Sequence, residues 1–272
     1  MGSKRIVLVV GVLTGYVLGG SAASAQTAYQ VIDVSDAGTI MGSVTWTGEK
    51  PAEMRLPINK DPEVCDADKH GTRSLERLVI GDDGGVANTV VFLRGVTKGK
   101  PLELPQSRES LNQQFCRYIP HIMLVPREGN LSMKNSDPIL HNIRMSGAAT
   151  YNLPFPFQYK EITRAMHEGG IVDLRCDAGH VWMNSEILVV DHPYYVVTDD
   201  SGRFKLAGVP PGDYEIAAWH EGWHVVRSYT FTDTDVHHQR QRPVFSEPRV
   251  WTKKVSVTAN GAATADFTIS EK

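Results

Sequence analysis

Helical periodicity is almost absent from this sequence of 272 residues. Apolar residues recur at helical spacing only at residues 109–114 and 161–167, where we expect one and two helical turns. Most other patterned stretches alternate with period two, are rich in β-branched and aromatic residues, and end at Gly, Pro, Asn or Asp. The pattern predicts an all-β protein built from short strands in sandwiches. The expected strands are residues 39–46, 78–80, 89–93, 122–125, 187–190, 194–198, 214–219 and 255–257.

The sequence also has little net charge and no familiar catalytic motif. Its formal net charge is -3 and its pI is about 6.4, so nothing in its global electrostatics favours a nucleic-acid partner. It contains no nucleophile elbow, Walker loop, H-E-x-x-H helix or C-x-x-C-H haem motif. We therefore expect a protein that is not an enzyme, although a copper enzyme stays open as a weaker hypothesis.

No apolar run is long enough to span a bilayer comfortably. The longest, residues 6–17, follows Lys4 and Arg5 and precedes the small residues Ala23-Ser-Ala25. This order is typical of an export signal, so residues 1–25 are the predicted signal peptide and Gln26 the first mature residue. A retained N-terminal anchor is the alternative. We expect a periplasmic or secreted protein that has no membrane contact after cleavage.

Cysteine is scarce, and the count is odd. Cys65, Cys116 and Cys176 are the three cysteines, and an odd number in an exported protein needs an explanation. If Cys176 holds a metal, Cys65 and Cys116 are free to form a disulfide. The alternative is that one of the three is buried and inert. The connectivity does not follow from the sequence.

What is present is a compact set of metal ligands. The segment Cys176-Asp-Ala-Gly-His180-Val-Trp-Met183 follows an upstream Asn135-Ser-Asp-Pro-Ile-Leu-His141-Asn142. Alone, each of these residues is more often a core or surface residue. Together, a thiol, two imidazoles and a thioether are the ligands of a blue-copper site, with a weak axial Met. The set predicts one copper ion held by His141, Cys176, His180 and Met183.

Residues 101–192 resemble a plastocyanin/amicyanin-like cupredoxin, in which one His precedes a Cys, His and Met on the last loop. The resemblance implies a Greek-key sandwich in which Asn142 ties the two ligand segments together. It also implies that Trp182 and residues 153–157 cover the second His and dock redox partners; packing of these aromatics between two domains is the alternative. Plastocyanins and amicyanins have two residues between Cys and His, whereas this chain has three.

The flanking residues resemble a carboxypeptidase regulatory-like (transthyretin-like) sandwich. Residues 197–216 match its T-D-x-x-G-x-F hairpin and P-x-G-x-Y turn, and residues 42–48 and 90–93 resemble its first half. The resemblance implies a non-catalytic host domain at residues 38–100 plus 193–270, with the cupredoxin-like domain inserted at 101–192. The whole layout is similar to secreted proteins of a methylamine-utilisation-protein-like family.

These features predict an exported mononuclear copper protein that carries single electrons between redox partner proteins. The alternative is a carbohydrate- or protein-binding scaffold module with a vestigial or copper-storage site. A second metal site at His220, Glu221 and His224 is a further possibility, since His and carboxylate at short spacing are competent ligands.

Overall fold

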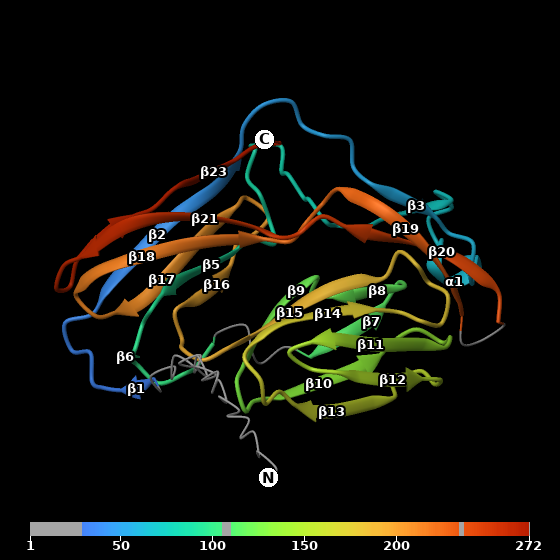
Figure 1. The fold of residues 1–272 in the computed structure, drawn as a ribbon, viewed down its shortest axis with the longest axis horizontal. Helices are drawn as coiled ribbons and strands as arrows, with labels where there is room; N and C mark the ends of the chain where they lie inside the picture. Colours follow the sequence, from blue (N-terminus) through green and yellow to red (C-terminus); the bar gives the residue numbers. More distant parts are fainter. Residues whose placement is uncertain (1–28, 105–109, 234–236, 272) are drawn as a thin grey trace, which may run out of the picture.

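The computed structural model describes residues 29–104, 110–233 and 237–271 (Figure 1). Almost all regular structure in these ranges is β, which confirms the all-β prediction; the helix α1 (Pro62–Cys65) spans four residues. No helix in the described ranges is long and apolar enough to cross a membrane. The predicted signal peptide, residues 1–25, lies outside the described residues.

One sandwich, here called sandwich A, is built from nine strands in two sheets of order β13-β10-β7-β8 and β12-β11-β14-β15-β9. Met133, Ile143, Val172 and Leu174 are among the apolar side chains that alternate inward and form one buried core. The strands are β7 (Leu111–Gln114), β8 (Arg117–Ile119), β9 (Ile122–Pro126), β10 (Asn130–Asn135), β11 (His141–Gly147), β12 (Tyr151–Phe155), β13 (Glu161–Ala165), β14 (Gly170–Arg175) and β15 (Asn184–Val190).

A second sandwich, sandwich B, has sheets of order β16-β5-β18-β21 and β17-β2-β22, with β23 also paired to β2. It has a separate core around Ile40, Leu93 and Ile216. Its strands are β2 (Gly38–Trp46), β5 (Val90–Arg94), β16 (Tyr195–Val197), β17 (Arg203–Val209), β18 (Gly212–His220), β21 (Arg249–Val257), β22 (Ala262–Thr264) and β23 (Phe267–Ile269). Sandwich A lies between β5 and β16 in the sequence; the domain boundaries and the transthyretin-like identity of sandwich B stay predictions.

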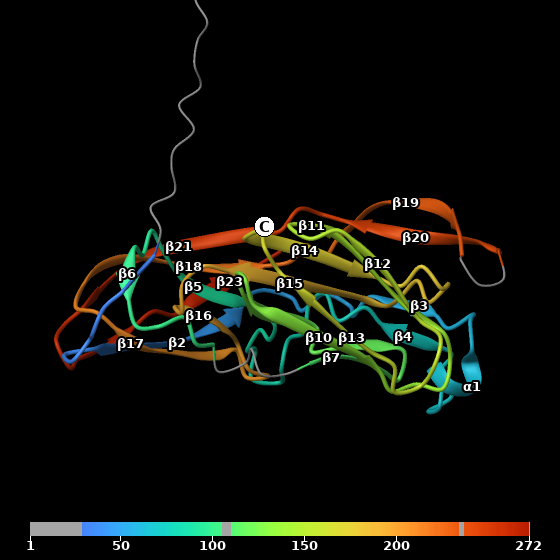
Figure 2. The same ribbon diagram turned by 90° about the horizontal axis from the view of Figure 1, so that it is seen from below.

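The two sandwiches lie side by side along the long axis of a flattened molecule (Figures 1 and 2). Two outgrowths from sandwich B reach over sandwich A. The cap segment, residues 55–74, contains β3 (Arg55–Pro57), α1 and β4 (Thr72–Ser74); the arm is the hairpin β19 (Val225–Thr232) and β20 (Gln239–Phe245). Val64 of the cap segment and Phe231 of the arm pack against the core of sandwich A. A short parallel pair, β1 (Gln30–Val31) and β6 (Lys98–Gly99), completes the described strands.

Three sequence predictions of secondary structure are wrong. Residues 161–165 form β13 rather than two helical turns, and residues 111–114 form β7 rather than one; residue 109 is outside the described residues. Both stretches pair with β10, and this tertiary pairing outweighs weak local periodicity. Residues 78–80 form only an isolated bridge between Ile80 and Val86, because the chain turns tightly between Gly81 and Gly85.

Candidate metal centre

The topology of sandwich A brings three predicted ligands to one end of one sheet. His141 begins β11, Cys176 directly follows β14, and His180 lies on the loop that leads to β15. Because β11 and β14 pair antiparallel, with Arg144 opposite Arg175, the start of one strand lies beside the end of the other. The ligand atoms of His141, Cys176 and His180 lie within 4.8 Å of one another, and all three side chains are fully buried.

His141 is held by the carboxylate of Asp137, which precedes it by four residues. Its Nε2 donates to Oδ2 of Asp137 at 2.8 Å, and Asp137 also accepts the backbone N–H groups of Phe115 at 2.9 Å and Cys116 at 2.8 Å. Nδ1 of His141 is buried without a hydrogen-bond partner. An unpaired buried imidazole nitrogen is costly unless a ligand satisfies it, so Nδ1 is the free metal-binding position of this residue.

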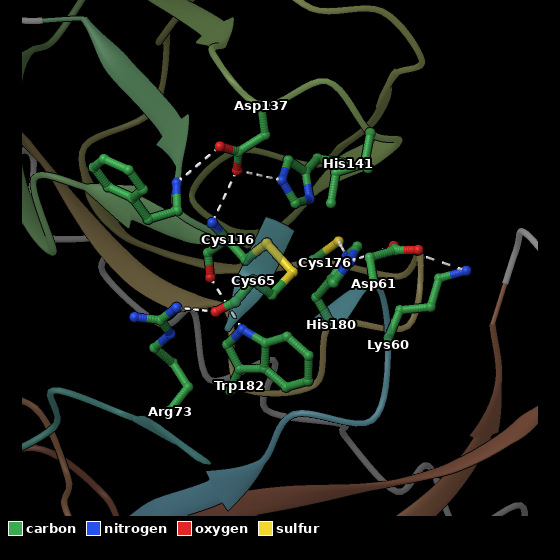
Figure 3. Close-up of a disulfide and its surroundings, with 12 residues drawn as sticks. Lys60, Asp61, Cys65, Arg73, Cys116, Asp137, His141, Cys176, His180 and Trp182 are labelled. Atoms are coloured by element: carbon green, nitrogen blue, oxygen red, sulfur yellow. Dashed lines mark hydrogen bonds and ion pairs between the residues drawn. A yellow bond between two sulfur atoms is a disulfide. The ribbon is translucent and has the colours of Figure 1, made fainter. Parts of the chain in front are cut away.

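His180 has the same arrangement with a different carboxylate. Its Nε2 lies 2.9 Å from Oδ2 of Asp61 in the cap segment, and its Nδ1 lies 3.5 Å from Sγ of Cys176 (Figure 3). Asp61 is the N-cap residue of α1 and has a φ of 48°. Its side chain makes no capping hydrogen bond to the helix and contacts His180 instead. A carboxylate on the outer nitrogen fixes the tautomer of a metal-ligating His and its orientation.

The charges of this cluster favour metal binding. Burial by itself would raise the pKa of the Cys176 thiol, but the adjacent imidazoles of His141 and His180 outweigh it and hold the pKa well below its usual range. Burial opposes protonation of His180, but the hydrogen bonds with Asp61 and Cys176 prevail and raise its pKa to about 9. The pKa of His141 is raised in the same way: burial opposes protonation of this imidazole, but its contacts with Asp137 and Cys176 prevail. The surroundings therefore favour the thiolate form of Cys176, which is the form of cysteine that binds a metal ion.

Cys65 and Cys116 form a disulfide, the pairing that the sequence left open. It joins α1 of the cap segment to the β7–β8 turn of sandwich A, across 51 residues of sequence. The disulfide borders the ligand cluster: Cys65, Cys116 and His180 offer ligand-type atoms within 4.8 Å of one another, and so do Cys116, Asp137 and His141. Figure 3 shows the disulfide beside His180 and Trp182.

Asn142 and Met183 both lie near the ligand cluster in sequence and are buried. The backbone N–H of Asp177 donates to Oδ1 of Asn142 at 3.4 Å, so Asn142 links the two ligand segments. Met183 is buried, and its backbone N–H donates to the carbonyl of His180 at 3.0 Å. Its role as axial ligand stays a prediction. The additional loop residue is accommodated at Gly179, whose φ of +100° few other residues adopt.

The side chains expected to form an apolar cover around the second His divide between buried and exposed positions. Trp182, Leu153 and Phe155 are buried in the core of sandwich A, and His180 is enclosed by the cap segment. Trp182 packs edge-on against His180, with ring centroids 5.5 Å apart, and donates Nε1–H to the carbonyl of Cys116. Trp182, Leu153 and Phe155 therefore lie neither on an open docking patch nor between the two sandwiches, whereas Phe157 is exposed.

The proposed second metal site is not assembled. In the described part of the chain, no group of three or more potential ligands includes His220, Glu221 or His224. Glu221 is buried and instead contacts Arg77 and His121, whereas His224 is exposed and lies 3.2 Å from Glu271. These residues follow one another in sequence but point to different partners.

Sequence reasoning missed two carboxylates and an arginine. Asp137 precedes His141 by four residues, a spacing that the sequence displayed but that has many other uses. Asp61 is 119 residues from His180, so no motif around His180 indicates this contact. Arg242 of the arm donates to the carbonyl of Cys176 at 2.5 Å and, with Met183, lines a cavity of about 350 Å³ beside the loop.

No protein-family model and no curated protein matches the chain. Several solved structures are similar to part of it. A purple cupredoxin from Nitrosopumilus maritimus is 20% identical, with 27% of this chain and 81% of that chain covered and a TM-score of 0.24. A Cu(I) amicyanin variant is 16% identical, covers 30% and 80%, and has a TM-score of 0.27. A copper-containing nitrite reductase from Thermus scotoductus is 15% identical, covers 35% and 24%, and has a TM-score of 0.28. Similarity this slight does not identify what the chain binds.

Proposed function

We propose that this chain is a mononuclear copper protein that carries single electrons between redox partner proteins. His141 and His180 would bind the ion through Nδ1 and Cys176 through its thiolate, with Met183 as a weak axial ligand. The single observation that carries the proposal is the orientation of the two imidazoles. Each is fixed at Nε2 by a carboxylate, and each leaves Nδ1 for the space beside the Cys176 sulfur.

The donor set supports copper over other ions. A His2Cys group with a weak axial thioether is diagnostic of blue-copper electron-transfer sites. When bound, copper would supply a one-electron couple, and the residues of this chain would hold it. The two carboxylates, the Asn142 link and the disulfide hold the ligands from several sides, so little rearrangement should accompany a change of oxidation state.

Burial of the cluster supports electron transfer rather than catalysis at the metal. A copper enzyme would need an open coordination position that a substrate can reach. The three ligand side chains are fully buried, and the cap segment covers His180. We therefore propose that the protein is not an enzyme. The disulfide between Cys65 and Cys116 favours a periplasmic or secreted location, because such bonds persist in oxidising compartments.

The proposal is tested by visible absorption, paramagnetic resonance and voltammetry of the protein reconstituted with Cu(II). We expect a strong thiolate-to-Cu(II) band and a reversible one-electron couple. Cys176→Ser should abolish the band while leaving the far-ultraviolet circular dichroism unchanged. His224→Gln, at an exposed His remote from the cluster, is the control and should keep it.

Two results would overturn the proposal. A colourless protein that binds no copper would exclude a copper carrier. Bound copper without a reversible couple would instead favour the scaffold or storage alternative.

A further inference from the structure

The disulfide lies directly against the copper ligands. Its sulfurs and His180 lie within 4.8 Å of one another, and Cys116 is also within that distance of ligand atoms of His141 and Asp137. His180 belongs to two sets of ligand-type atoms, one with Cys65 and Cys116 and the other with His141 and Cys176. The described residues thus place a second group of soft donors beside the first.

In the disulfide state these sulfurs are not available to a metal, because the thiolate is the ligand form of cysteine. Reduction would convert them to two thiols whose Cα atoms are 5.2 Å apart, next to the His180 imidazole. Two thiolates and an imidazole are a donor set that suits Cu(I), as it also suits Zn²⁺. The reduced chain therefore offers a Cu(I) site that the disulfide form lacks.

The same bond also controls access to Cys176. The cap segment lies over His180. Its contacts include the disulfide, the Asp61–His180 contact, the packing of Leu56, Ile58 and Val64 on the core of sandwich A, and a bond from Arg240 to Asn59 of 3.0 Å. The disulfide is the only covalent anchor among these contacts of the described residues. With the disulfide closed, Cys176 and both histidines are fully buried, so a copper donor has no direct path to them.

We propose that Cys65, Cys116 and His180 form a Cu(I) entry site in the reduced chain, and that closure of the disulfide passes the ion to Cys176. The second step rests on the copper function proposed above. In it, the two thiolates release Cu(I) and form the S–S bond, and their two electrons reduce the disulfide of an external thiol–disulfide oxidant. The two thiolates formed from that oxidant take up two protons from solvent. The copper stays Cu(I) and is retained by His180 while it gains Cys176 and His141.

The entry site is tested in the full-length chain with Cys176→Ser, which removes the final thiolate but keeps the disulfide cysteines. Cys176→Ala is a second variant, in case a buried hydroxyl disturbs the fold. The reduced variant should withdraw one equivalent of Cu(I) from the chelator bicinchoninate. On addition of glutathione disulfide it should lose both free thiols and return the copper to the chelator. Cys65→Ser/Cys116→Ser in a Cys176→Ser background is the control and should not withdraw Cu(I).

The transfer step is tested in the wild-type chain. Reduced protein loaded with Cu(I) should keep its copper when glutathione disulfide closes the bond, and subsequent one-electron oxidation should produce the thiolate-to-Cu(II) band. Equal Cu(I) binding by the reduced and disulfide forms of Cys176→Ser would overturn the entry site, as would copper retained by that variant after the disulfide closes. Wild-type protein that keeps one equivalent of copper after the disulfide closes, but shows no such band on one-electron oxidation, would instead reject the copper function, whatever the chelator titration gives.

Discussion

Oδ2 of Asp61 lies 2.9 Å from Nε2 of His180, although 119 residues separate the two in the sequence. This contact joins the cap segment, an outgrowth of sandwich B, to the ligand loop of sandwich A. It reserves Nδ1 of His180 for a metal, as Asp137 does for His141. Both imidazoles are therefore set for binding by neighbours outside the ligand motif.

Asp61→Asn is expected to weaken Cu(II) binding about tenfold or more, since loss of such an outer carboxylate typically costs 10–100-fold in affinity. Asn keeps the left-handed backbone of residue 61 accessible but removes the charge that holds His180. Competition against a Cu(II) chelator measures the effect. Glu63→Gln, an exposed carboxylate of the same helix, should leave the affinity unchanged. Equal affinities of the Asp61 variant and wild type would contradict the assigned role.

Met183→Leu separates axial ligation from core packing. Leu has a similar volume, so we expect a loss of stability below about 1.5 kcal/mol. If the thioether of Met183 is the weak axial ligand, its removal should raise the reduction potential while the thiolate-to-Cu(II) band persists. Voltammetry gives the potential. An unchanged potential would show that Met183 only fills the core.

Gly179→Ala should destabilise the ligand loop. A Cβ at this position would lie 2.8 Å from Nε of Arg240 and 3.0 Å from Oδ2 of Asp233, and φ is +100°. We expect a loss of about 1–3 kcal/mol in the free energy of unfolding. Gly48→Ala is a matched control, because Gly48 has φ +96° but nothing within 4 Å of the added Cβ. Urea unfolding of both variants separates the effect of steric crowding from that of the positive φ. Equal losses in the free energy of unfolding would mean that the side chains of Arg240 and Asp233 move aside without cost.

Cys65→Ser/Cys116→Ser should lower the free energy of unfolding by about 4 kcal/mol, the loop-entropy value for a crosslink of this span. The two residues are 51 apart in the sequence. Guanidinium unfolding with and without the substitutions measures the difference. A loss below about 1 kcal/mol would show that the cap segment is held by its non-covalent contacts alone.

Glu186→Gln is expected to flatten the pH dependence of stability. Burial and the nearby Glu221 raise the pKa of Glu186 to about 7 from 4.5, although Arg77 lies 3.0 Å away. Between these two values the folded chain binds more protons than the unfolded chain, so stability falls as pH rises. Gln does not ionise, and the variant should be more stable than wild type at pH 8 by on the order of 1–3 kcal/mol, with little difference near pH 4.5. Urea unfolding at several pH values measures the effect. If the free energy of unfolding depends on pH in the same way in the variant and in wild type, this assignment is rejected.

Local patterns sufficed for the fold class and for the ligand motif. Period-two alternation predicted β structure, and the spacing from Cys176 to Met183 singled out one loop. The helices expected at residues 109–114 and 161–167 were wrong because both stretches pair with β10, a contact that no local window contains. His180 itself is fully buried for a similar reason, since residues far upstream enclose it.

The sequence by itself determined the chemistry that is available: three cysteines, of which Cys176 shares a short loop with an imidazole and a thioether, and a second imidazole upstream. Only the tertiary structure decided which nitrogen of each His faces the thiol, which carboxylates hold them, and that a disulfide borders them. The physical reason is the distance in sequence between the residues that interact. A motif is local, whereas the orientation and the pKa of His180 depend on Asp61, which reaches it only after the cap segment packs against sandwich A.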